Sequence, residues 1–126
     1  MHGLIIDDDR DTLLIIQSIL AHKQIICTTL HDPTQIHTVL AHLTKPIDIV
    51  LLDLSLPDMN GYDMLAILRN QYHISAPIIA CSGSHEEMAQ TRDMGFDGFL
   101  GKPIRFDKLA ERIACVVNGD EVWSVD

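Results

Sequence analysis

Residues 49–53 read Ile-Val-Leu-Leu-Asp, four apolar side chains in a row followed by a carboxylate. A strand with one face in water alternates apolar and polar side chains. An unbroken apolar run is instead typical of a parallel strand that is covered on both faces. The stretch therefore predicts a central strand of a parallel sheet, with Asp53 at its carboxyl end.

Short apolar runs of this kind alternate along the chain with longer stretches of helical periodicity. This alternation is typical of βα units and predicts an α/β fold, a doubly wound parallel sheet of five strands with five helices on its two faces. The strands are predicted over residues 3–6, 25–29, 48–52, 77–81 and 98–100. The helices are predicted over about 10–22 and 34–43, from 61, from 84 to 95, and over 106–118.

Two of the predicted helices carry signals at their ends. Asp9 precedes the first helix and suits an N-cap, because its carboxylate can accept bonds from free N–H groups. Residues 84–87, Ser-His-Glu-Glu, match a capping box, and Gly95 lies where a left-handed C-terminal cap would fall.

Length, charge and hydropathy limit the class of protein. The 126 residues suit one folded domain over 1–118, with 119–126 as a tail or the start of a linker. The net charge of −9 argues against a nucleic-acid surface, which needs lysine and arginine. No apolar run is long enough to cross a bilayer and no leader pattern opens the chain, so a cytoplasmic location without membrane contact is expected.

Cysteine and histidine give little support for a soft-metal site. Cys27, Cys81 and Cys115 lie in apolar contexts and are predicted to be free buried thiols. The seven histidines include no pair at the spacing of three or four residues that places two imidazoles on one helical face.

Polar side chains follow four of the predicted strands where each strand ends. They are the acidic run 7–9, then Asp53, Ser82 and Lys102. Each has an ordinary explanation alone, as a helix N-terminal acid, a loop cap, a loop residue or a surface lysine. Ligands of open parallel sheets bind beyond the carboxyl ends of the strands, however, so the four positions are expected to converge on one pocket.

Such a pocket would need a cation. Two carboxylates about 4 Å apart repel each other by about 4 kcal/mol at an effective dielectric of 20. Asp7, Asp8 and Asp53 supply only hard oxygen ligands, which favour Mg²⁺, with Mn²⁺ as a substitute.

The residues that follow the strands resemble the response-regulator receiver family of two-component signalling. The resemblance rests on residues 4–9, 49–61 and 77–83 and on Lys102-Pro103, in the family's order and near its spacing. It implies a flavodoxin-like receiver fold with strand order 2-1-3-4-5.

The resemblance also implies the chemistry. Asp53 would accept a phosphoryl group from a histidine kinase or a histidine phosphotransfer protein, so the domain would not be an enzyme beyond its own phosphoryl transfer and autodephosphorylation. Asp8, Asp53 and the backbone carbonyl of Ser55 would bind the metal, and Asp7 would act through water. Lys102 would contact the phosphoryl group.

Further implied features concern the switch. Ser82 would bind another phosphoryl oxygen, Phe99 would change rotamer with it, and the Lys102–Pro103 peptide would be cis. The surface of the fourth helix, fifth strand and fifth helix would carry the signal to a downstream partner or output domain. A homodimer through that surface stays open.

Other functions fit less well. A haloacid-dehalogenase phosphatase needs a second acid two residues after the nucleophile, where this chain has Ser55. A nucleotide or flavin site needs a glycine-rich first loop, and the loop here is acidic. The remaining alternative is a receiver-like interaction module that takes no phosphate, although no required group is missing.

Overall fold

The computed structural model describes residues 1–125 and contains one sheet of six parallel strands in the order β2-β1-β3-β4-β5-β6. The first five strands confirm the predicted order. The prediction of a five-stranded sheet is wrong by one strand, because residues 122–124 of the expected tail pair with β5. The strands are β1 (His2–Ile6), β2 (Ile26–Leu30), β3 (Ile49–Asp53), β4 (Ile78–Ser82), β5 (Gly98–Gly101) and β6 (Val122–Ser124).

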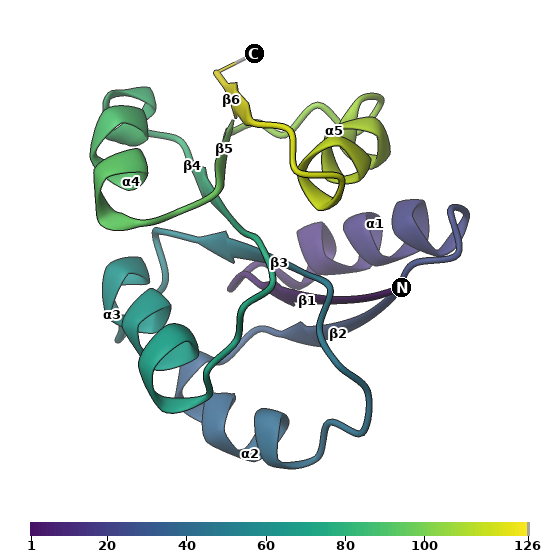
Figure 1. Cartoon of the computed structure of the whole chain (residues 1–126), viewed down its shortest axis with the longest axis vertical. Helices are drawn as coiled ribbons and strands as arrows, with labels where there is room; N and C mark the ends of the chain where they lie inside the picture. The colour runs from purple at the N-terminus through teal and green to yellow at the C-terminus, as the bar shows by residue number, and fades with distance from the viewer. Residues whose placement is uncertain (126) are drawn as a thin grey trace.

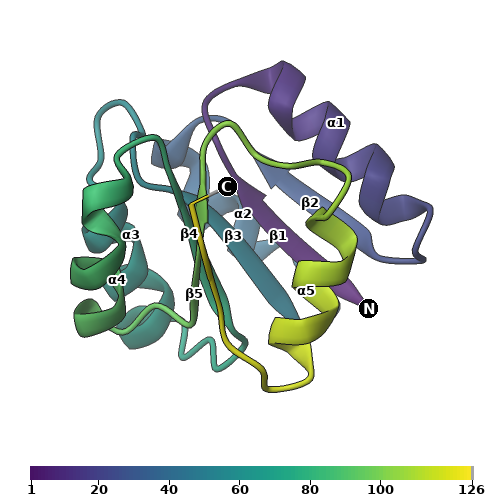
Figure 2. The same ribbon diagram turned by 90° about the horizontal axis from the view of Figure 1, so that it is seen from above.

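Helices cover both faces of the sheet (Figures 1 and 2). The α-helices α1 and α5 lie on one face, and α2, α3 and α4 lie on the other. Short helical turns adjoin three of them. The bounds are α1 (Arg10–Ala21), η1 (Pro33–Gln35), α2 (Ile36–Ala41), α3 (Gly61–Ala66), η2 (Ile67–Gln71, a π-helix), η3 (His85–Glu87), α4 (Met88–Met94) and α5 (Leu109–Val117).

Apolar side chains of the central strands alternate between the two faces and form two cores. Ile5 and Leu51 point to the α1 and α5 side, where they meet Ile16 and Ile113. Leu4 and Leu52 belong to the opposite core with α2 and α3. Because both faces are covered, every residue of β1, β3 and β4 is buried and their interiors are apolar, as the sequence predicted.

The helix-end predictions have mixed outcomes. Asp9 caps α1 by accepting hydrogen bonds from the backbone N–H groups of Asp11 and Thr12. Gly95 ends α4 with φ +105°, the left-handed conformation that glycine tolerates. The capping box is wrong, because the Ser84 side chain makes no cap bond and the Glu87 carboxylate accepts from other side chains.

A single arginine fastens the amino ends of β4 and β5. One terminal nitrogen of Arg69 donates to the carbonyls of Ile74 and Ala76, at 2.6 and 2.7 Å. The other is 2.7 Å from Asp97 Oδ2, which also accepts from the Ile78 N–H. These contacts join the amino ends of β4 and β5, at the end of the sheet opposite the Asp53 carboxylate.

Candidate functional site: an acidic pocket at the carboxyl end of the sheet

The carboxyl ends of β1, β3 and β5 open onto one cavity of about 610 Å³. Parallel strands end at the same edge, so the acids after β1 meet the acid of β3 and the lysine after β5. The residues from the predicted site that line the cavity are Asp7, Asp8, Asp53, Ser55, Lys102 and Pro103.

Asp53 is nearly inaccessible, and its two oxygens have different surroundings. Oδ1 accepts a hydrogen bond from the Ser55 N–H and lies 3.0 Å from Lys102 Nζ. Oδ2 is buried and has no hydrogen-bond partner among the described residues. Burial raises the pKa of Asp53, while the Ser55 N–H and the Lys102 ammonium oppose that rise.

Lys102 joins the two buried carboxylates of the pocket. Its Nζ is 3.3 Å from Asp7 Oδ2 as well as 3.0 Å from Asp53 Oδ1. Burial acts to lower the pKa of Lys102, but the hydrogen bonds and charges of Asp53 and Asp7 outweigh it and raise that pKa. The ammonium therefore stays charged and compensates part of the acidic charge.

The acids of the pocket fit a divalent cation. Asp7, Asp8 and Asp53 each offer a carboxylate oxygen, and these oxygens lie within 4.8 Å of one another. Within residues 1–125, Asp53 Oδ2 is a buried acceptor that receives no hydrogen bond, which suits an oxygen that binds a cation. One lysine among three carboxylates leaves the pocket with excess negative charge, which a hard, oxygen-preferring ion such as Mg²⁺ would neutralise. The Ser55 carbonyl and the water-mediated role of Asp7 stay predictions.

Ser82 lies at the predicted strand end, but its hydroxyl is engaged elsewhere. Ser82 Oγ donates to Glu87 Oε1 at 3.1 Å and accepts from the Ser84 N–H at 3.0 Å. The other oxygen of Glu87 accepts from the Tyr62 hydroxyl at 3.0 Å. Burial, with the neighbouring Glu87 charge, raises the pKa of Tyr62 to about 12, so the phenol remains a donor.

The sequence interpretation missed Glu87 and Tyr62 because it assigned Glu87 to a capping box. A strand-end serine followed five residues later by a glutamate was the available signal. Gly83 lines the cavity and Ser82 is absent from its lining, which is consistent with a hydroxyl turned toward Glu87.

The two remaining predicted residues lie on and directly after β5. Phe99 is fully buried in the core on the α3 and α4 side. The Lys102–Pro103 peptide is cis, and the Lys102 N–H donates to the Ser82 carbonyl at 2.8 Å. The backbone therefore links the lysine of the pocket directly to β4.

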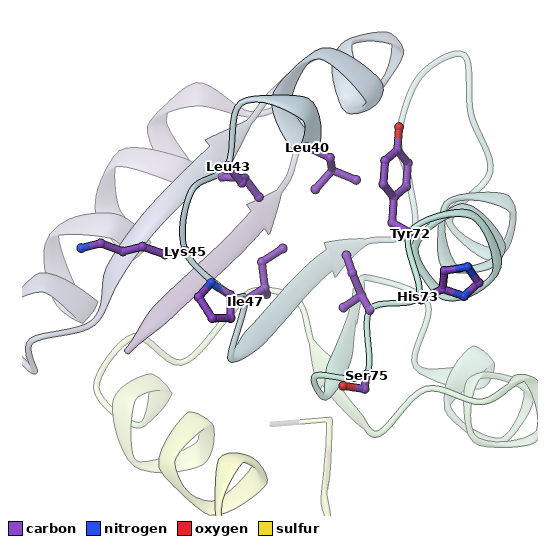
Figure 3. Close-up of a pocket in the computed structure, with 9 residues that line it drawn as sticks. Leu40, Leu43, Lys45, Ile47, Tyr72, His73 and Ser75 are labelled. Carbon is purple, nitrogen blue, oxygen red and sulfur yellow. The ribbon is translucent and has the colours of Figure 1, made fainter.

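A second cavity, of about 290 Å³, lies between the segment after α2 and the segment after η2 (Figure 3). Its lining includes Leu40, Leu43 and Ile47, and the Lys45 side chain points away from it. None of the predicted site residues lines it. Without convergent polar groups, it is a weaker candidate than the acidic pocket.

The fold and the pocket define a doubly wound α/β domain with an acidic site, and comparison with known sequences identifies its family. Residues 4–114 match the response regulator receiver domain, so the chain belongs to that family. RcaC of Microchaete diplosiphon is 32% identical over 124 residues, which are 96% of this chain and 19% of RcaC. The transcriptional regulatory protein KdpE of Staphylococcus aureus is 34% identical over 115 residues, which are 90% of this chain and 48% of KdpE. The chain thus spans half or less of these relatives.

Solved structures agree with this assignment. The receiver domain of the Francisella response regulator 1452 is 27% identical with a TM-score of 0.79, covering 93% of this chain and 96% of that one. The chemotaxis response regulator CheY4 of Vibrio cholerae shares the fold at 20% identity and a TM-score of 0.79, covering 91% and 97%. No described helix is long and apolar enough to span a membrane.

Proposed function

We propose that this receiver domain is a phosphorylation switch whose acceptor is the Asp53 carboxylate. The observation that supports this proposal most directly is the different environment of the two Asp53 carboxylate oxygens. One oxygen contacts Lys102 and the Ser55 N–H, and the other is buried in a three-acid cluster without a hydrogen-bond partner in the described part of the chain. A carboxylate held at one oxygen and unpartnered at the other is oriented for nucleophilic attack.

The reaction transfers a phosphoryl group from a phosphohistidine of a histidine kinase or phosphotransfer protein. An Asp53 oxygen forms a bond to phosphorus as the phosphorus–nitrogen bond of the donor breaks, which leaves an acyl phosphate and a neutral imidazole. Asp8, Asp53 and the Ser55 carbonyl would hold Mg²⁺ directly and Asp7 through water, and the ion when bound would neutralise the charge of the phosphoryl oxygens.

Lys102 and Ser82 would hold the product through its phosphoryl oxygens. Lys102 already lies against Asp53, so its ammonium can follow the new charge with little movement. Ser82 would first have to leave Glu87. Phe99, on the strand that leads to Lys102, would then adjust its rotamer, and the surface of α4, β5 and α5 would change.

The partners follow from the same proposal. The kinase or phosphotransfer protein supplies the phosphoryl group, and a downstream protein or output domain would recognise the α4–β5–α5 surface. The relative KdpE is named as a transcriptional regulatory protein. With its net charge of −9, this domain would contribute to such a role without binding nucleic acid itself. A cytoplasmic location suits these partners.

Intact mass after incubation with acetyl phosphate and Mg²⁺ tests the proposal. The wild type should gain one phosphoryl group, and Asp53→Asn should gain none because its amide is not a nucleophile. Asp58→Asn is the matched control, since Asp58 is an exposed aspartate on the loop after β3. If the wild type gains no phosphoryl mass, the domain is the interaction module instead.

A further inference from the structure

The outer edge of β5 is covered by a later segment of the same chain. β6 pairs with β5 in parallel, with Gly98 opposite Val122, Phe99 opposite Trp123 and Leu100 opposite Ser124. The yellow segment in Figure 1 shows β6 at the end of the sheet beside β5. The surface that would carry the signal is therefore occupied in this conformation.

The return of the chain to β5 is built into the end of α5. Gly119 has φ +95°, which favours glycine. Its N–H donates to the Val116 carbonyl, and the Asp120 N–H donates to the Cys115 carbonyl at 2.9 Å. These two bonds form a Schellman motif, which reverses the chain and directs it along β5.

Glycines at both ends of β5 permit the close approach of this segment. A Cβ atom at Gly98 would lie 2.9 Å from the Val122 carbonyl oxygen. A Cβ atom at Gly101 would lie 2.8 Å from His85 Nε2 and 2.9 Å from the Val125 Cα. Any other residue at either end would push the backbone of the covering segment away, so β5 is shaped to accept a strand.

The covering segment contacts both layers of helices. Val122 packs against the core on the α1 and α5 side, and Trp123 packs against the core that contains Phe99. The guanidinium of Arg92, on α4, lies 4.4 Å from the centroid of the Trp123 ring, a cation–π contact. One aromatic side chain thus bridges α4 and β5.

The docking is nevertheless weak enough to be reversible. β6 has only three residues, and all three are partly exposed. The Trp123 Nε1 is buried without a hydrogen-bond partner among the described residues, which disfavours the docked position. Short edge segments with few buried contacts open at low free-energy cost.

We propose that residues 120–125 are a displaceable strand that closes the α4–β5–α5 surface in cis and is loosened when Asp53 carries a phosphoryl group. This inference rests on the proposed function. β5 connects the two places, because Lys102 follows it directly and contacts Asp53, while Phe99 lies opposite Trp123. The rotamer change of Phe99 proposed above would alter the part of β5 against which Trp123 docks.

Quenching of tryptophan fluorescence by acrylamide tests the strand, because Trp123 is the single tryptophan of the chain. Adding Mg²⁺ and beryllofluoride, a phosphoryl mimic, should at least double the quenching constant in the wild type and leave Asp53→Asn unchanged. Gly98→Val should raise the constant without the mimic. Arg92→Ala should raise it less, and Asp93→Ala, on the same helix, should not change it.

The outcomes separate this inference from the proposed function. If Asp53 gains a phosphoryl group but quenching stays constant, the displaceable strand is wrong and the phosphorylation switch stands. If Gly98→Val and Arg92→Ala both fold, by circular dichroism, and both quench like the wild type, the strand is not docked as described. If neither phosphoryl mass nor a response to the mimic is found, both proposals fail.

Discussion

The two sides of the acidic pocket differ in how their polar groups are engaged. On the β1 and β3 side, Asp7 and Asp53 share one lysine and face the cavity. On the β4 side, the Ser82 hydroxyl is bound to Glu87, which also holds Tyr62 of α3. Strand topology brings backbones together, but competition among nearby hydrogen-bond partners decides where a side chain points. Under the proposed function, the first side needs little rearrangement for phosphoryl transfer, whereas the Ser82 hydroxyl of the second side would have to leave Glu87.

Removal of the shared lysine should have the largest effect on stability. Lys102→Ala leaves two buried carboxylates without their cation, and breaking a buried ion pair costs about 3–5 kcal/mol. Because the Lys102 side chain is 30% exposed, we expect a smaller loss of about 2–3 kcal/mol in urea unfolding at pH 7. Lys45→Ala, at an exposed lysine, is the control. Equal stability of Lys102→Ala and the wild type would contradict the shared ion pair.

Magnesium should stabilise the folded domain by binding on the acidic side of the pocket. At ten times its dissociation constant, a ligand of the folded state alone stabilises it by about 1.4 kcal/mol. For a domain of this size, that corresponds to a rise in Tm of about 4–6 °C. Asp8→Asn should abolish most of the rise, because Asp8 contributes one of the clustered oxygens. An Asp8→Asn variant that responds like the wild type would remove Asp8 from the metal site.

The raised pKa of Asp53 predicts how stability depends on pH. Folded Asp53 holds its proton to higher pH than the unfolded chain does, so its ionisation costs folding stability as pH rises from near its ordinary value of 3.8 through its folded pKa. Asp53→Asn should therefore be more stable than the wild type at pH 7 without metal, because the amide removes a buried charge that disfavours folding at that pH.

The Asp53→Asn advantage should vanish below that pH window, where the wild-type carboxyl is protonated in both states. Urea unfolding of the two proteins from pH 3 to pH 8 measures the difference. A difference that is constant across this range would show that Asp53 titrates as in the unfolded chain.

The smallest effect should come from the serine side. Glu87→Ala removes the acceptor of the Ser82 hydroxyl, which then becomes free to bind a phosphoryl oxygen. One hydrogen bond contributes about 1 kcal/mol net, so affinity for beryllofluoride should rise about three- to five-fold in a titration with Mg²⁺ present. Glu86→Ala, at the exposed neighbour, should leave affinity unchanged. If Glu87→Ala lowers affinity, Glu87 supports the activated state instead.

The sequence alone predicted strands β1 to β5 and the convergence of the acids with Lys102. The strands could be predicted because continuous apolar runs are a local pattern. The pocket could be predicted because parallel topology alone brings the strand ends together. The sixth strand was not predicted, because Val122-Trp123-Ser124 is a short edge segment that follows two acids and contains no apolar run. Glu87 was misassigned because a serine and glutamate three residues apart suit a capping box as well as a side-chain network.

The Arg69 contacts at the opposite end of β4 and β5 have a consequence for stiffness. A guanidinium that ties two loop carbonyls and Asp97 leaves little freedom where these strands begin. Any displacement of β4 and β5 should therefore be smallest at their amino ends and largest at their carboxyl ends, beside Ser82 and Lys102. Amide hydrogen exchange should accordingly be slowest at Ile78 and faster toward Gly101, and Arg69→Ala should flatten that gradient.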